Sequence, residues 1–314
     1  MTQQQHLADI VAYLCARYPH KSELSNARLT KLVYLADWRS VQDSGRQITD
    51  IDWVFNHYGP WVPDVVNVAD HDSRFGVETG VNAYGSPRKT IVLKPEAARD
   101  AANRVDVRTA TILDLVIAET RGMYFNPFIR YVYATLPVRI TAKGSFLPLA
   151  DIRNEHPESQ VPLPRAVLTG VLSAEDYTAV RTELSQITAE RLLDPAWGDR
   201  TDPPLTNLPP LAGLRVRRVS LWPDLVVEPH RQDLVISAVA LCAADAEVAP
   251  RSPTPVGFQA NADDSTPTVT ALTTNLLTTI HASVTLPLRA GTMKLTSIRF
   301  AAPTASTEPA TEHV

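Results

Sequence analysis

Side chains that could bind a metal or activate water are present in this sequence, but their spacing does not assemble a site. The 314 residues include eight histidines and two cysteines, the side chains that most often bind transition metals. No two histidines stand about three to five residues apart, as helical ligand pairs do, and neither Cys15 nor Cys242 has a second ligand close in sequence. The polar run Asp70-His71-Asp72 is typical of a solvated turn. The sequence therefore predicts no metal site.

Motifs for nucleophilic catalysis or phosphate binding are also missing from the sequence. It contains no G-x-S-x-G elbow, Walker loop or G-x-G-x-x-G turn, and its 12 glycines do not cluster. Catalytic residues that converge only in three dimensions would escape such a search. We therefore expect no catalytic residues and no cofactor, and an enzyme remains an alternative mainly for the C-terminal half.

Composition places the chain among ordinary globular proteins. Hydrophobic residues make up 44% of the sequence and charged residues 20%, so neither disorder nor a fibrous repeat is predicted. The formal net charge of -4 gives no general attraction to nucleic acid. The N-terminus lacks a signal-peptide pattern, and no apolar run reaches the roughly 18 residues of a membrane span. We expect a cytoplasmic protein without membrane contact, in which both cysteines are buried thiols.

Apolar spacing predicts a mainly helical N-terminal half. Apolar residues recur at helical intervals over residues 7–14, 29–36 and 112–117. Ser25 or Asn26 can cap the second of these helices. The other expected elements are a strand at 51–55, a helix with Pro60 in its first turn that runs to about 69, hairpin strands at 74–82 and 88–93, a short helix from Pro95, and a helical segment at 124–133.

A change of composition after Leu149 predicts a domain boundary. Residues 150–172 are polar and rich in proline, which is typical of a linker. Ser173 and Asp176 fit a capping box at the start of a further helix. The expected strands cover 214–221, 225–228, 233–242, 269–273, 280–286 and 293–300, with a polar loop at 249–267. The predicted class is α+β, with a helical domain and small β-hairpin at 1–149, a linker at 150–172, a β-rich domain of unknown role at 173–300, and a disordered tail at 301–314.

Two segments of the N-terminal half carry a distinctive pattern. The first reads Lys31-Leu32-Val33-Tyr34-Leu35-Ala36-Asp37-Trp38, and the second, beyond Gly45, reads Asp52-Trp53-Val54-Phe55-Asn56-His57-Tyr58-Gly59-Pro60-Trp61-Val62-Pro63. This order of a K-L-x-Y-L-A-D helix and an aromatic strand entering Y-G-P resembles the Panacea, or SocA-like, antitoxin domain. The resemblance implies the antitoxin of a type II toxin–antitoxin pair, which holds a cognate protein toxin inactive by direct contact. It supplies no catalytic residues to transfer.

The same two segments supply the candidate site residues. Large aromatic side chains often anchor protein interfaces. The candidate partner-binding residues are Trp38, Trp53, His57, Tyr58 and Trp61. The residues expected to maintain the motif's structure are Lys31, Tyr34, Asp37, Gly59 and Pro60. Core packing is the alternative role for each aromatic residue, and Trp61, which follows the turn, is the first candidate for an exposed contact.

Other binding roles stay open at this point. A proteolytic adaptor, the role of one member of the family that the motif resembles, would deliver the toxin to a protease unfoldase. A DNA-binding autorepressor would need a basic face, and the only local basic cluster of the C-terminal half is Arg215, Arg217 and Arg218. The net charge makes DNA the less favoured partner. The sequence is also compatible with a homo-oligomer.

Overall fold

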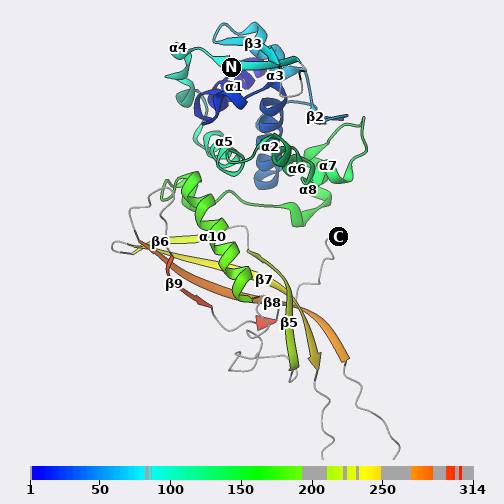
Figure 1. Cartoon of the computed structure of the whole chain (residues 1–314), viewed down its shortest axis with the longest axis vertical. Coiled ribbons are helices and arrows are strands. Elements are labelled where there is room, and N and C mark those ends of the chain that lie inside the picture. The colour runs from blue at the N-terminus through cyan, green and yellow to red at the C-terminus, as the bar shows by residue number, and fades with distance from the viewer. Residues whose placement is uncertain are drawn as a thin grey trace, which may run out of the picture. The chain divides into compact units, whose positions relative to one another are not determined.

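The computed structural model describes residues 2–81, 85, 87–192, 211–221, 225–230, 233–248, 270–285, 295–300 and 304–305. The chain divides into two compact units, Met1–Thr178 and Ala179–Val314, and each is described by itself. Figure 1 labels their helices and strands along the chain. In the described segments, no helix combines the length and the hydrophobicity needed to cross a bilayer.

Helix α2 (Asn26–Ser44) is the centre of the first unit. Its side chains are buried on every side from Arg28 to Trp38. Helices α1 (Gln3–Arg17), α5 (Val107–Thr120) and α6 (Phe125–Tyr133) pack around it, as Figure 1 shows. The Ser25 side chain accepts the Arg28 amide N–H at the start of α2, and Gly45 ends the helix with a φ of 76°. The predicted helices over residues 7–14, 29–36 and 112–117 are therefore confirmed.

Short helices complete the first unit. They are η1 (Lys21–Glu23), α3 (Asp64–His71), α4 (Pro95–Ala98), η2 (Ala101–Arg104), α7 (Leu136–Ile140), α8 (Leu149–Glu155), η3 (Pro157–Ser159) and α9 (Arg165–Leu168). Three of them, α8, η3 and α9, lie in or across the segment 150–172, for which the sequence predicted a linker.

The segment 150–172 packs onto α2 and α5 despite its polar composition. The Val161 amide N–H donates to the Gln42 carbonyl at 3.2 Å, and the Leu163 amide N–H donates to the Asp43 carboxylate at 2.9 Å. Isolated apolar side chains in this segment, among them Ile152, Leu163 and Ala166, are buried. Average composition concealed these anchors, and the division between the two units falls after Thr178.

Two β-hairpins belong to the first unit. Strands β1 (Val54–Asn56) and β2 (Gly59–Trp61) pair antiparallel around a two-residue turn, and β3 (Phe75–Val81) pairs in the same way with β4 (Pro87–Leu93). The 74–82 and 88–93 hairpin was predicted, whereas the β1–β2 hairpin was not.

The prediction that Pro60 lies in the first turn of a helix is wrong. Pro60 lies in β2 opposite Phe55, and α3 begins only at Asp64, after Pro63. Proline is accepted in an edge strand, where its missing N–H removes no sheet hydrogen bond. The same residue type therefore fits a helix start and a strand edge, and local sequence did not separate the two.

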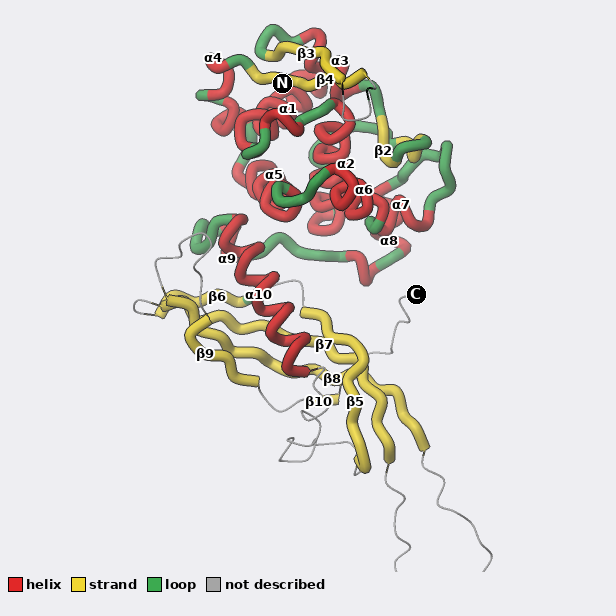
Figure 2. The backbone as a smooth tube through the Cα atoms, viewed as in Figure 1, coloured by secondary structure: helices red, strands yellow, loops and turns green. Residues whose placement is uncertain are grey.

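The second unit contains most of α10 (Ala174–Leu192) and the remaining described strands. Ser173 accepts the Asp176 amide N–H at 3.0 Å, so the predicted cap of this helix is confirmed. The strands are β5 (Leu211–Leu221), β6 (Val226–His230), β7 (Asp233–Val248), β8 (Thr270–Thr285), β9 (Leu295–Phe300) and β10 (Thr304–Ala305). They pair antiparallel in the order β10-β8-β7-β5, with β6 on β7 and β9 on β8. Figure 2 draws these strands as yellow tubes. The expected loop at 249–267 and the tail at 301–314, apart from β10, lie outside the described residues.

Candidate functional site

The buried carboxylate of Asp37 connects α2 to the loop that precedes β1. It accepts the amide N–H groups of Ile48 and Thr49 at 3.0 and 2.9 Å. It also accepts the Thr49 hydroxyl at 2.5 Å and the Trp53 indole N–H at 2.8 Å. Burial raises the pKa of Asp37 to about 7, although each of these donors acts to lower it. Asp37 therefore ties α2 to the loop at residues 48–49 and to Trp53.

Two of the aromatic residues expected to touch a partner lie in the core instead. Trp38 and Trp53 are buried, and the Trp53 ring packs edge-on against Tyr34 with ring centroids 5.5 Å apart. The Tyr34 hydroxyl hydrogen-bonds with the Thr135 hydroxyl at 2.8 Å. A contact role does not fit Trp38 or Trp53 because their rings face other parts of the same chain.

A third segment extends the β1–β2 hairpin into a small sheet. The Phe55 amide N–H donates to the Ser145 carbonyl at 2.9 Å, and the Leu147 amide N–H donates to the Trp53 carbonyl at 2.8 Å. Phe146 forms an antiparallel bridge with Val54 between these two bonds. The partner segment lies far along the chain and has no strand pattern of its own, so this pairing was not predicted from the sequence.

The outer face of this small sheet carries exposed aromatic side chains. Val54 lies opposite Trp61 on one side and Phe146 on the other, and directly opposed residues of antiparallel strands point to the same face. Trp61 is 42% exposed and Phe146 is 68% exposed. His57 and Tyr58 form the turn, and Tyr58 is 85% exposed. We call Tyr58, Trp61, Val54 and Phe146 the hairpin surface; Tyr58 and Trp61 were predicted as contacts and Phe146 was not.

Beneath the hairpin, Gly59 lies against Lys31 and Tyr133. Gly59 has a φ of 95°, and a Cβ atom there would lie 3.2 Å from Tyr133 Cε2 and 3.5 Å from Lys31 Cε. The Tyr133 ring packs edge-on against Phe55, with centroids 5.9 Å apart. Lys31 is 3% exposed, and burial lowers its pKa to about 8. Both the backbone conformation and the space at residue 59 favour glycine.

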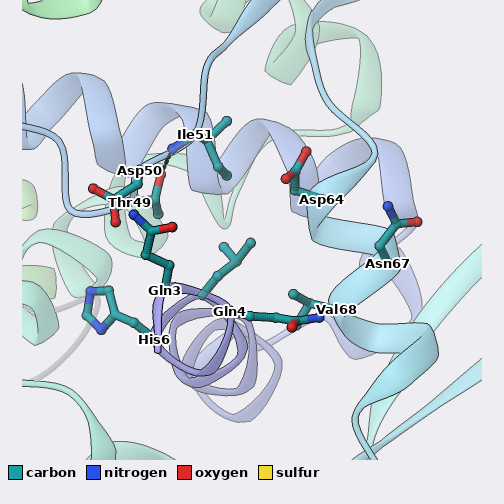
Figure 3. A pocket seen from close by; sticks show the side chains of 10 residues that line it. Gln3, Gln4, His6, Thr49, Asp50, Ile51, Asp64, Asn67 and Val68 are labelled. Atoms are coloured by element: carbon teal, nitrogen blue, oxygen red, sulfur yellow. Dashed lines mark hydrogen bonds between the residues drawn. The ribbon is translucent and has the colours of Figure 1, made fainter. Parts of the chain in front are cut away.

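A separate cavity of about 290 Å³ lies between the start of α1, the loop at 49–51 and α3. Figure 3 shows its side chains: Gln3, Gln4 and His6 from α1, Thr49, Asp50 and Ile51 from the loop, and Asp64, Asn67 and Val68 from α3. The Ile51 amide N–H donates to the Thr49 hydroxyl at 3.3 Å. The described lining contains no cysteine, lysine or arginine, and nowhere in the described residues do three His, Cys, Asp or Glu side chains gather as a metal site would need. The cavity does not assemble a nucleophile with a base.

The comparisons with known proteins bear on the N-terminal half. Residues 29–136 match the family model described as "Antitoxin SocA-like, Panacea domain". The match includes α2, the β1–β2 hairpin, α5 and α6, and it confirms the resemblance seen in the two motif segments. The C-terminal region matches no family model, and neither a curated protein nor a solved structure matches the chain.

Proposed function

We propose that this protein is the antitoxin of a type II toxin–antitoxin system and neutralises a cognate protein toxin in the cytoplasm by direct binding. The family match over residues 29–136 carries the proposal. The matching family is one of antitoxins and is not a known enzyme family, which supports binding without a chemical step.

The hairpin surface is the proposed contact area for the toxin. Tyr58, Trp61 and Phe146 expose large aromatic side chains on one small sheet that the core holds in place through Phe55. Rigid, exposed aromatic residues lose little conformational entropy on binding and bury much area. His57 lies in the exposed turn and belongs to the same proposed surface.

The C-terminal part is proposed as a second, β-rich module that is accessory to toxin binding. The predicted antitoxin domain at 1–149 is extended in this proposal to Thr178, because residues 150–172 supply side chains to the core of the first unit. Arg215, Arg217 and Arg218, the basic cluster on which a DNA-binding role would depend, lie in β5.

Co-expression tests the proposal. The gene that neighbours this chain's gene is induced alone, with the full chain, or with a chain ending after Leu192 so that α10 stays whole. We expect growth arrest by the neighbour alone and recovery with the full chain and with the shortened chain. A harmless neighbour, or arrest that persists with the full chain, would reject the antitoxin assignment.

The amount of neighbour protein after a block of translation separates two modes of rescue. A constant amount during recovery supports inhibition by direct contact. A faster decline with the full chain than without it would instead identify a proteolytic adaptor that passes the toxin to an unfoldase.

A further inference from the structure

Lys31 has a largely buried side chain whose ammonium has no partner among the described residues. Only 3% of its surface is exposed, and none of the hydrogen bonds or ion pairs among the described residues involves its ammonium group. The terminal nitrogens of Arg28 and the carboxylate of Asp37, the other charges buried on α2, do have partners. Arg28 donates to the Tyr18 hydroxyl at 2.8 Å and pairs with Glu23 at 3.2 Å, and Asp37 accepts four donors within 3.0 Å.

The charge on Lys31 is not explained by stability. Removing an ammonium from water without a counter-ion is costly, and an uncharged side chain of similar length would fill the same space without that cost. Burial lowers the pKa of Lys31 to about 8, which is the direction expected of an unpaired buried amine. A residue type that opposes folding at its position is a candidate for a role in binding.

Lys31 lies directly below the hairpin surface. Its Cε atom is 3.5 Å from the position that a Cβ atom of residue 59 would occupy, and the ammonium is one bond further along. Gly59 follows the exposed Tyr58, and the Tyr133 hydroxyl donates to the His57 carbonyl at 3.4 Å. Glycine at 59 leaves the ammonium uncovered by any side chain from that strand position. The cation therefore lies against the hairpin at Gly59, which follows the exposed Tyr58 in the chain.

We propose that the ammonium of Lys31 binds a carboxylate of the toxin, whose apolar neighbours pack on Tyr58, Trp61 and Phe146. This inference rests on the proposed antitoxin function and names the chemistry of the toxin's contact. A single carboxylate fits better than a nucleic-acid phosphate because polyanions need several cations, whereas the hairpin surface is aromatic and the chain has a net charge of -4. A charge pair desolvated among aromatic rings is a typical centre of a tight interface.

Binding measurements on the full chain test the proposal. The probe is the purified product of the neighbouring gene, titrated calorimetrically with the wild type, Lys31→Met and Lys143→Met. Lys143 is exposed on the segment beside Phe146, so its variant loses the same charge at the surface. We expect Lys31→Met to weaken binding roughly 30-fold or more, and Lys143→Met to change it by less than about threefold.

Titration of the lysine side chain gives a second readout that needs no variant to fold. In a chain labelled with ¹³C at lysine Cε, the Lys31 signal is followed against pH, free and with the neighbouring gene product. We expect its pKa to rise on binding, because a carboxylate favours the charged form. Unchanged titration, equal binding by Lys31→Met, or a rise produced by duplex DNA and not by the protein probe would each overturn the inference.

The two proposals fail in different ways. If the wild type neither binds the neighbouring gene product nor restores growth, the antitoxin function itself is rejected. If the wild type binds and restores growth while Lys31→Met does both equally well, only the carboxylate contact is rejected.

Discussion

Two ionisable side chains of α2, Asp37 and Lys31, are both buried but differ in their hydrogen-bond partners. Asp37 lies under the loop before β1 and accepts two backbone and three side-chain donors. Lys31 lies under the β1–β2 turn and has no such partner among the described residues. Six residues correspond to about 600° along an α-helix, so the two side chains leave α2 on different faces. The comparison separates a buried polar group that has several hydrogen-bond partners from one that has none among the described residues.

The largest effect is expected on the Asp37 side. An Asp37→Asn substitution replaces one carboxylate oxygen by an amide NH₂, which is a donor. At least one of the buried N–H groups that now donate to Asp37 would then face another donor and lose its hydrogen bond. We expect the free energy of unfolding to fall by about 4 kcal/mol. Guanidinium denaturation at pH 5, below the folded-state pKa of Asp37, measures it. Asp52→Asn, the same chemical change at an exposed position of the loop, should stay within about 0.5 kcal/mol of the wild type.

An Asp37 variant as stable as the wild type would break the comparison, since Asp37 would then be as dispensable to the fold as we infer Lys31 to be.

The contribution of Asp37 to stability should also depend on pH. With a folded-state pKa of about 7 against an ordinary value of 3.8, the folded chain holds this proton longer than the unfolded chain does. The contribution of Asp37 to stability is therefore greatest below about pH 4 and declines as the pH rises through 7.

The Lys31 side should respond in the opposite direction. Lys31→Met removes an unpaired buried charge, so we expect stability at pH 7 to increase by up to about 3 kcal/mol, the free energy of a pKa displaced from 10.5 to about 8. Between pH 8 and 10.5 the folded wild type has lost this proton while the unfolded chain retains it. The wild type should therefore approach the variant in stability as the pH rises across this range.

Denaturation of the wild type and Lys31→Met at pH 7 and pH 10 measures the effect. The difference in unfolding free energy should shrink at the higher pH, and Lys143→Met should show no such trend. A destabilised Lys31→Met variant would show that the ammonium supports the fold, and the contrast with Asp37 would disappear.

A smaller effect concerns the space between Lys31 and the hairpin. Gly59 and Gly144 both have positive φ angles, 95° and 88°, but only a Cβ at 59 would meet other atoms within 4 Å. We expect Gly144→Ala to cost about 1 kcal/mol for the backbone alone and Gly59→Ala about 2 kcal/mol. Thermal or denaturant unfolding of both variants measures their losses of unfolding free energy. The difference between the two losses is the cost of the contact that the new Cβ atom makes with Tyr133 and Lys31. Equal costs would mean that the hairpin can lift away from α2 without penalty.

Local sequence was enough to predict the long helices α1, α2 and α5, because apolar spacing and caps are local. Ser25 and Gly45 delimit α2, and the motif from Lys31 to Asp37 lies in this helix, which is the centre of the first unit. The burial of Trp38 and Trp53 could not be read in the same way, since an aromatic side chain fits a core and an interface equally well.

Contacts between distant segments account for what the sequence did not show. Phe146 joins the hairpin surface only because its segment pairs with β1, a contact between residues far apart in the chain. The burial of Ile152 and Leu163 was not predicted for a related reason. Single apolar residues among prolines can be assigned to a core only when it is known that their segment packs on α2. That Lys31 has no hydrogen-bond partner among the described residues likewise depends on its neighbours in space, so it could not be predicted from a motif.

The smallest effect on stability, and the sharpest on function, is expected at the tip of the hairpin. Tyr58 is 85% exposed, so Tyr58→Ala should change the free energy of unfolding by less than about 0.5 kcal/mol. Its binding to the neighbouring gene product should nevertheless weaken roughly 30-fold, as expected for an aromatic anchor of an interface. Tyr124→Ala is the matched control, because Tyr124 is 79% exposed at the opposite end of α6 from Tyr133. If both variants bind like the wild type, the toxin does not touch the hairpin, and the carboxylate proposed for Lys31 loses the apolar contacts that would bring it there.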